Sequence, residues 1–188
     1  AQQLCEGRSK AVLKLIVSSG SGGRGYARPS DVPPTRWLQI SDWPSAAQYQ
    51  NADHSLALQW CELRLADQPR LAGIKHLNRL EQVLARQELS DDVHEGLLCD
   101  QQGNVIEGIA SNLLLKVEDK YITPDLTNSG VAGVVRQLLL NKAHTSGIDV
   151  EVAAVTTQQV QEAQGIYMMN SLLGIRPVSR LVEHRFQE

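Results

Sequence analysis

Short apolar runs separated by polar turns recur along the chain and predict more strands than helices. Strand-like runs lie at 12–18, 35–40, 55–64, 96–99, 105–106, 112–117, 120–122, 149–152 and 165–169, and Arg-Pro-Val at 176–178 closes the ordered pattern. Helical spacing or helix-end signals predict three helices: from close to His76 to about Glu88, from Gly133 to Ser146 with a stop at Gly147, and over 157–163. The strands follow one another across turns more often than they alternate with helices. The pattern favours an α+β fold with a curled, mostly antiparallel sheet and flanking helices.

The overall composition excludes several classes of protein. The chain has 188 residues, of which 42% are hydrophobic, and a formal net charge of -3. That size suits one domain, and the absence of a basic block argues against nucleic-acid binding. No apolar run is long enough to cross a bilayer, so no membrane association is expected. The three cysteines are far apart and the histidines are scattered, so we expect no metal site, no disulfide framework and a reducing, cytoplasmic setting.

The beginning of the chain has an unusual pattern. A polar stretch opens the sequence at Ala1 and runs directly into the first predicted strand. It resembles the tail of a helix whose beginning is missing. Residues 1–11 are therefore interpreted as the remnant of a linker from a missing N-terminal domain, and residues 12–188 as one large domain.

Lys75 is the first candidate for chemistry. Apolar residues at 77, 80, 83 and 84 recur at helical spacing after Gly73, which places Lys75 at or beside a predicted helix N-terminus. The helix macrodipole there disfavours an ammonium ion, and the neutral amine is the form that Schiff-base chemistry needs. On position alone, an ordinary solvated lysine at a helix start remains the simpler alternative.

Glu107 is the second candidate, because a carboxylate stands among apolar neighbours. Ile106, Ile109 and Leu113 flank it in sequence, so at least partial burial is expected. A buried carboxylate usually needs a cation or hydrogen-bond donors. The partner could be a protein cation such as Arg79 or Arg136, or a protonated ring nitrogen of a bound cofactor.

Further candidates are positions where a phosphate or a carboxylate could bind. The glycine-containing run 129–136 leads into a helix, whose free backbone N–H groups suit a phosphate. Ser171 follows a predicted strand and is either a phosphate ligand or a turn residue. Arg24 and Tyr26 stand in a flexible, glycine-rich loop and could meet a substrate carboxylate. That loop lacks the G-K-[ST] ending of a P-loop, which argues against mononucleotide binding.

The order of these motifs resembles fold-type IV pyridoxal-phosphate enzymes, the class of branched-chain and D-amino-acid aminotransferases. The motifs are Arg-Gly-Tyr at 24–26, Ile-Lys-His-Leu-Asn at 74–78, Val-Ile-Glu at 105–107 with Ser-Asn at 111–112, Gly-Val-Val-Arg at 133–136, and Asn-Ser at 170–171 before Arg-Pro-Val. Within this class, the stretches 71–83 and 19–26 look most like the aminodeoxychorismate lyases. The resemblance covers about 12–178 and implies the large domain of the class, a pseudo-barrel.

The resemblance implies pyridoxal 5′-phosphate as the cofactor, with Lys75 as the Schiff-base lysine. It implies that Glu107 hydrogen-bonds the pyridine nitrogen and keeps it protonated. The phosphate would be bound by the backbone N–H groups of Val134 and Val135 and by the hydroxyl of Ser171.

The resemblance also implies a substrate and an assembly. Arg24 and Tyr26 occupy positions that contact a substrate carboxylate in related aminotransferases. The implied reaction converts 4-amino-4-deoxychorismate to 4-aminobenzoate and pyruvate in folate biosynthesis, in a homodimer with sites near the interface. The alternatives are a fold-type IV aminotransferase and a non-catalytic fragment without cofactor. One departure from the family is that residues 1–10 do not match the small N-terminal domain that supplies an arginine to the phosphate.

Overall fold

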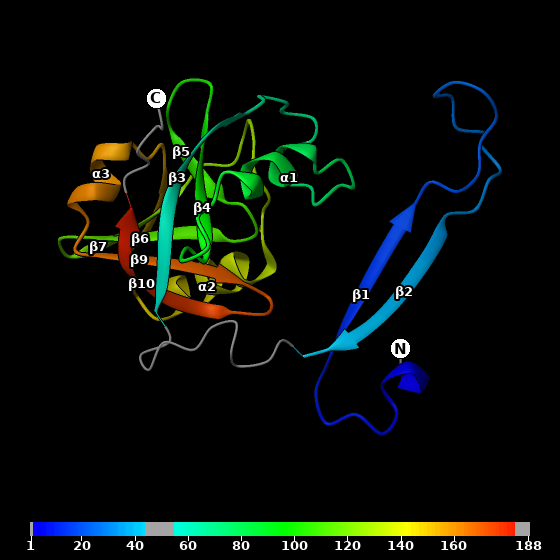
Figure 1. Cartoon of the computed structure of the whole chain (residues 1–188), viewed down its shortest axis with the longest axis horizontal. Coiled ribbons are helices and arrows are strands. Elements are labelled where there is room, and N and C mark those ends of the chain that lie inside the picture. The colour runs from blue at the N-terminus through cyan, green and yellow to red at the C-terminus, as the bar shows by residue number, and fades with distance from the viewer. Residues whose placement is uncertain (1, 44–54, 183–188) are drawn as a thin grey trace. The chain divides into compact units, whose positions relative to one another are not determined.

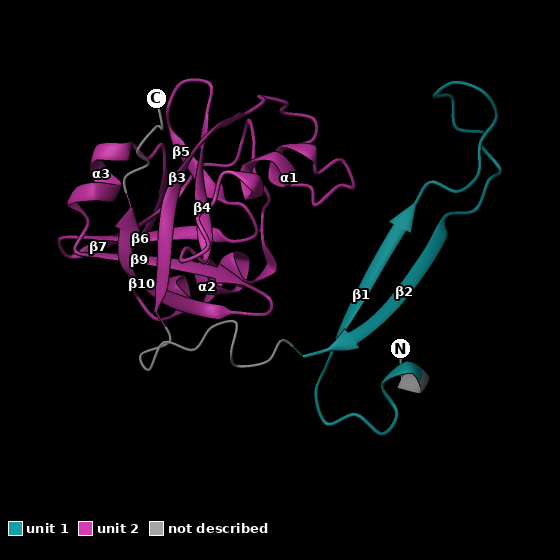
Figure 2. Cartoon of the chain, in the orientation of Figure 1, with its two compact units in different colours: residues 1–48 teal, residues 49–188 magenta. Residues whose placement is uncertain are grey.

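The computed structural model describes residues 2–43 and 55–182 of the chain. The chain divides into two compact units, Ala1–Gln48 and Tyr49–Glu188 (Figure 2). The predicted linker over residues 1–11 stays a prediction, whereas the division by spatial contacts falls between residues 48 and 49. The irregular connection expected after Trp43 lies outside the described residues.

The first unit is built on an antiparallel hairpin. After a short 3-10 helix η1 (Gln2–Cys5), β1 (Ala11–Ser18) pairs with β2 (Thr35–Asp42), and Ser18 lies opposite Thr35. Both predicted strands are confirmed. Apolar side chains on the hairpin, including Leu15 and Trp37, are exposed. Because they are exposed, these side chains are available to pack against another surface. A two-stranded hairpin is only marginally stable by itself and would gain stability from such packing.

The second unit contains a curled sheet of eight strands (Figure 1). Their order in space is β5-β4-β3-β10-β9-β6-β7-β8. Their bounds are β3 Leu56–Leu65, β4 Glu95–Asp100, β5 Val105–Gly108, β6 Asn112–Val117, β7 Lys120–Pro124, β8 Val150–Ala153, β9 Gly165–Asn170 and β10 Gly174–Val182. The predicted α+β class and curled sheet are confirmed.

One feature of the predicted sheet needs correction, because the sheet is mixed. The pairs β3–β4, β3–β10 and β7–β8 are parallel, and the other pairs within this sheet are antiparallel. Adjacent hairpins are visible in the sequence through their turns. The parallel pairs join strands that are far apart along the chain, so no local turn signal marks them.

Two hairpins flank the central strands, and each turn has a distinct local feature. At the β4–β5 turn, Asp100 Oδ1 accepts the N–H groups of Gln102 and Asn104 at 3.0 and 2.8 Å. Gly103 there has φ +88°, a conformation that favours glycine. At the β6–β7 turn, Glu118 has φ 51° between paired residues Val117 and Lys120.

Two buried clusters cover opposite faces of β4 and β5. Leu97 and Val105 belong to the larger cluster, whereas Leu98 and Ile106 belong to the other. Successive residues of a strand point to opposite faces, so these strands are covered on both sides. Every residue of β4 and β5 is buried, and polar groups carried there are removed from water.

Three helices accompany the sheet: α1 (Leu80–Gln87), α2 (Val134–Thr145) and α3 (Thr157–Glu162). The last two match the prediction, and a capping box between Thr156 and Gln159 explains where α3 starts. The predicted start of α1 near His76 is wrong. Its periodic apolar residues are mostly in solvent, and Leu80 is 70% exposed, whereas Ala85 is the buried residue of the helix.

Candidate functional site

Lys75 lies in an irregular loop, five residues before α1 begins at Leu80. The macrodipole acts mainly within the first helical turn, so the predicted electrostatic effect of a helix start on Lys75 does not apply. The loop is attached instead to a second loop of the unit. Gly73 N donates to Gly130 O at 2.9 Å, and Ala132 N donates to Gly73 O at 3.0 Å. This pairing, and not a helix, determines where the Lys75 segment lies.

Glu107 is buried as predicted, with 4% of its surface exposed at the middle of β5. Its Oε2 accepts a hydrogen bond from Val131 N at 2.8 Å. Burial raises the pKa of Glu107 to about 7. The Val131 N–H and the charges of Arg79 and Lys75 act on this pKa in the opposite direction, and the charge of Glu95 adds to the increase.

Neither arginine proposed as a partner from the sequence pairs with Glu107. Arg136 donates to Thr123 Oγ1 at 3.1 Å and to Pro124 O at 2.9 Å, so it anchors α2 to β7. Arg79 donates to backbone carbonyls of its own loop. Within the described part of the chain, no cation forms an ion pair with Glu107. Its other carboxylate oxygen can therefore accept a bond from a ligand.

One loop joins the two candidates. Val131, which donates to Glu107, also forms a bridge with Gly73, two residues before Lys75. Gly130 in this loop has φ +85°, and a Cβ on it would overlap Ile106 and Leu126. The structure thus brings the buried acid and the lysine loop together through the segment 129–133.

The same segment leads into the N-terminus of α2. Asn112 clamps it, because its Nδ2 donates to Val131 O at 2.8 Å and its Oδ1 accepts from Gly133 N at 3.2 Å. Gly133 is the N-cap residue and provides no side-chain cap. The first hydrogen bond of the helix runs from Gln137 N to Gly133 O, so the N–H groups of Val134 and Val135 have no helical partner. An anion could bind there.

Ser171 is exposed in the turn between β9 and β10. The preceding Asn170 shapes that turn, because its Oδ1 accepts the N–H groups of Leu172 and Leu173 at 2.9 and 2.8 Å. Asn170 Nδ2 also donates to Ala110 O at 3.1 Å. This bond connects the Ser171 turn to the loop that follows Glu107.

Several positioning residues were missed in the sequence, and Glu95 is the clearest. It is buried, and its carboxylate accepts from Ser111 Oγ at 2.7 Å and from the N–H groups of Ala110 and Gly96. Burial raises its pKa. The signal available in the sequence was a polar residue at the start of an apolar, strand-like run. Asn112 shows the same signal.

Arg24 and Tyr26 lie in the first unit, on the loop between β1 and β2. Both side chains are exposed, and Tyr26 is fully so. Their expected contact with a substrate carboxylate stays a prediction.

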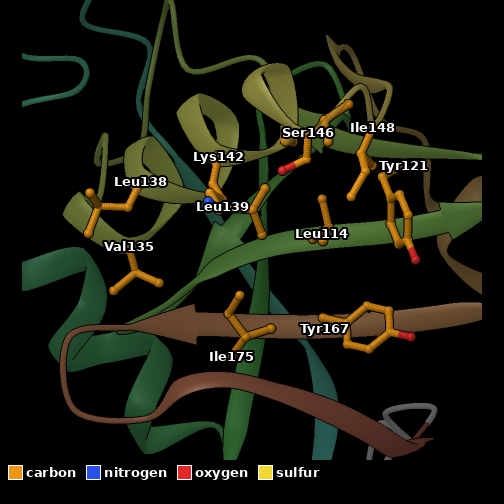
Figure 3. Close-up of a pocket in the computed structure, with 12 residues that line it drawn as sticks. Leu114, Tyr121, Val135, Leu138, Leu139, Lys142, Ser146, Ile148, Tyr167 and Ile175 are labelled. Carbon is orange, nitrogen blue, oxygen red and sulfur yellow. The ribbon is translucent and has the colours of Figure 1, made fainter.

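A separate hollow lies beneath α2 and does not contain Lys75 or Glu107 (Figure 3). Its volume is about 540 Å³, and its walls are mainly apolar, with Leu114, Leu139 and Ile175 among them. The side chain of Val135 lines this hollow. The apolar side chain of Val135 thus belongs to this hollow, and its predicted backbone bond to a phosphate stays a prediction.

Two other kinds of site have no counterpart in the described part of the chain. Among residues 2–43 and 55–182, no group of three or more His, Cys, Asp or Glu side chains could hold a metal ion. None of the helices in these ranges has the length and apolar content needed to cross a membrane.

Comparison with known sequences identifies the family. The sequence model of Amino-transferase class IV matches residues 2–181. The chain belongs to this family. It is 39% identical to an aminodeoxychorismate lyase of Vibrio harveyi over 171 residues, which are 90% of this chain and 62% of the relative. It is 34% identical to a probable branched-chain-amino-acid aminotransferase of Thermotoga maritima over 66% of this chain and 45% of that protein.

Solved structures show the same relationship. The structure of 4-amino-4-deoxychorismate lyase from Pseudomonas aeruginosa superposes with a TM-score of 0.85 at 44% identity, covering 93% of this chain and 64% of the other. The branched-chain amino acid aminotransferase from T.th., in complex with N-(5′-phosphopyridoxyl)-L-glutamate, has a TM-score of 0.71 at 18% identity, with coverage of 91% and 56%. It shares the fold. The chain spans a little over three fifths of the length of these two lyases, from Vibrio harveyi and Pseudomonas aeruginosa.

The first testable prediction concerns the pH dependence of stability. Between pH 4.5 and about 7, folded Glu107 holds a proton that the unfolded chain has released. This residue therefore lowers the free energy of unfolding as the pH rises through that range. Glu107→Gln removes the effect and can still accept from Val131, so its stability relative to the parent should rise by roughly 3 kcal/mol from about pH 4 to about pH 8.

Urea unfolding of the cofactor-free protein at both pH values measures this difference. Glu162→Gln on α3 is the control, because Glu162 is exposed and its replacement should leave the difference flat. A flat profile for Glu107→Gln as well would contradict the effect of burial on Glu107.

Proposed function

We propose that this chain carries the cofactor site of a pyridoxal-phosphate lyase that converts 4-amino-4-deoxychorismate to 4-aminobenzoate and pyruvate. The observation that carries the proposal is the buried Glu107, held by Val131 beside the loop of Lys75 and, among the described residues, without a cation paired to it. The names of the relatives at 39% and 44% identity support the choice of reaction. The 4-aminobenzoate product places the reaction in folate biosynthesis.

The donor groups fit this cofactor. Glu107 offers a carboxylate oxygen to the protonated pyridine nitrogen, which would supply the charge that the buried acid lacks. The unpaired N–H groups of Val134 and Val135 suit the phosphate, and Ser171 adds a hydroxyl. Lys75, on the adjoining loop, provides the primary amine that binds the aldehyde.

When bound, the cofactor supplies an electron sink for the substrate carbon next to the amine. With its amine free, Lys75 would take the proton from C4 of the substrate as general base. The enolpyruvyl C–O bond then breaks, and the departing group receives a proton and becomes pyruvate. Loss of C4–H and of this group leaves the aromatic ring of 4-aminobenzoate. Arg24 and Tyr26 are proposed to bind a substrate carboxylate.

An aminotransferase of the same family is the second candidate, and the relative from Thermotoga maritima favours it. It would use the same Lys75 and Glu107 but would need a keto acid to accept the amino group. A folded chain that binds no cofactor is the third candidate.

We further propose that the chain works as a homodimer in the cytoplasm. Six apolar residues on the Lys75 loop and α1 are exposed: Leu71, Ile74, Leu77, Leu80, Val83 and Leu84. Exposed apolar side chains that follow one another along a loop and a helix suit an interaction site. The three cysteines are free, and Cys61 and Cys99 are buried, which suits a reducing compartment.

The reaction is tested by supplying the purified chain with cofactor and substrate but no keto acid. A lyase releases pyruvate under these conditions, whereas an aminotransferase does not turn over. Lys75→Ala should abolish release, and the control Lys116→Ala should not. Peptide mapping after borohydride reduction should find the pyridoxyl group on Lys75. A pyridoxyl group on Lys14 or Lys116 would overturn the site.

A second experiment tests the proposed phosphate site by titrating cofactor into variants. Ser171→Ala removes a hydrogen bond to a charged group and should weaken binding about ten- to hundredfold. Gly133→Ala should also weaken it, because the added Cβ would overlap Asn112 Oδ1 and displace the clamp. Val135→Ala should bind like the parent, since only its backbone contributes. If Ser171→Ala bound normally and Val135→Ala failed, the phosphate would lie elsewhere.

Analytical ultracentrifugation tests the assembly. A dimer at micromolar concentration is expected, and the double substitution of Leu80 and Leu84 by Ser should shift it toward monomer. A parent chain that sediments as a monomer at all concentrations would contradict the proposal.

A further inference from the structure

Arg79 has an unusual position, because it joins the start of α1 to the loop that carries Lys75. Its backbone carbonyl accepts the first hydrogen bond of α1, from Val83 N at 3.1 Å. Its side chain turns back along the chain. Nε donates to His76 O at 2.9 Å, and a terminal nitrogen donates to Ile74 O at 3.2 Å. The two acceptors are the carbonyls of the residues on either side of Lys75.

The segment between Gly73 and Arg79 needs such a restraint, because it has no regular secondary structure. Its N-terminal end is fixed by the bonds of Gly73 to Gly130 and Ala132. Beyond Gly73, the backbone bonds of the segment run from Ile74 N to Leu71 O at 3.1 Å and from His76 N to Ile74 O at 3.0 Å. Among the described residues, Arg79 provides every side-chain hydrogen bond made to segment 74–78.

We propose that Arg79 is a positioning residue that holds the carbonyls of Ile74 and His76 and thereby fixes the Lys75 amine in front of the cofactor aldehyde. This inference rests on the proposed function, since it assumes that Lys75 binds the cofactor. Arg79 itself need not touch the cofactor. A guanidinium can hold two carbonyls at once through its several N–H groups, whereas a lysine ammonium acts as a single point charge.

The charge of Arg79 gives it a second effect. The charges of Arg79, Lys75 and Glu95 all act on the pKa of Glu107. Arg79 favours the ionised carboxylate, and this contribution is independent of whether Lys75 has reacted. Arg79 therefore acts on both candidate groups, on Lys75 through the backbone and on Glu107 through its charge.

The test separates reaction at Lys75 from binding of the rest of the cofactor. The variants are Arg79→Met and Arg79→Lys. The matched control is Arg86→Met, because Arg86 lies on α1, the helix that Arg79 precedes as N-cap residue, and also donates to a carbonyl, that of His94 at 3.3 Å. Two probes are used with each: pyridoxal 5′-phosphate followed by borohydride, which reports the rate of reaction at Lys75, and pyridoxine 5′-phosphate, which has no aldehyde and reports binding alone.

Arg79→Met should slow the reaction at Lys75 about tenfold or more, the size expected for losing a hydrogen bond to a charged group. Binding of pyridoxine 5′-phosphate should stay within about twofold of the parent. The rate of reaction at Lys75 in Arg79→Lys should lie between those of Arg79→Met and the parent. Arg86→Met should react like the parent. An unchanged rate in Arg79→Met would overturn the proposal, and so would an equal loss with both probes, which would indicate a general structural role.

A third readout keeps the inference testable if the parent itself does not react at Lys75, which would overturn the proposed function. Hydrogen exchange of the His76 amide is then measured in the cofactor-free proteins. Faster exchange in Arg79→Met, but not in Arg86→Met, would support the restraint on the loop. Equal exchange in all three proteins would overturn it.

Discussion

The hydrogen bond from Val131 N to Glu107 Oε2, at 2.8 Å, is the contact on which the candidate site depends. A carboxylate in an apolar interior needs compensation, and a single backbone N–H provides only part of it. The raised pKa of Glu107 is the consequence in the cofactor-free chain. A protonated ring nitrogen would complete the compensation. The burial that destabilises the ionised acid would thus favour a cation bound beside it.

The same contact determines how closely the surrounding segments must approach. Val131 can reach Glu107 only if Gly130 lies against Ile106 and Leu126 without a side chain of its own. Gly73 pairs with this segment on one side, and Asn112 holds it on the other. Lys75 follows Gly73, and α2 follows Gly133. The acid, the amine and the start of α2 are therefore positioned by one loop of five residues, 129–133.

Much of the fold could be predicted from the sequence, because many strands pair in local hairpins whose turns can be recognised in the sequence. The turn at 100–104 marks β4 and β5, and Gly133 and Gly147 mark the ends of α2. The parallel pairs could not be predicted, because they depend on contacts between distant strands. The predicted start of α1 was wrong. Leu77 and Leu80 continue a helical pattern in the sequence, but the pairing of Gly73 with the 130–132 loop interrupts the helix there. Exposed apolar side chains there match helical spacing without facing a core.

Only part of the candidate site could be predicted from the sequence. Burial of Glu107 followed from its apolar neighbours, but its partner did not, since Arg79 and Arg136 both bond elsewhere. The sequence predicted that a helix macrodipole would make Lys75 reactive, but α1 begins too far from this residue. Lys75 remains the candidate for binding the cofactor. Asn112, Asn170 and Glu95 act through bonds to backbone groups of distant segments, and no spacing in the sequence reveals such bonds.

The most direct test of this account is a carbon-13 NMR titration of the Glu107 side-chain carboxyl, with and without pyridoxal 5′-phosphate. Without cofactor, the carboxyl should titrate with a pKa of about 7. With cofactor bound, it should remain ionised well below that pH, because the protonated ring nitrogen stabilises the carboxylate. A titration unchanged by saturating cofactor would contradict the claim that Glu107 binds the cofactor ring.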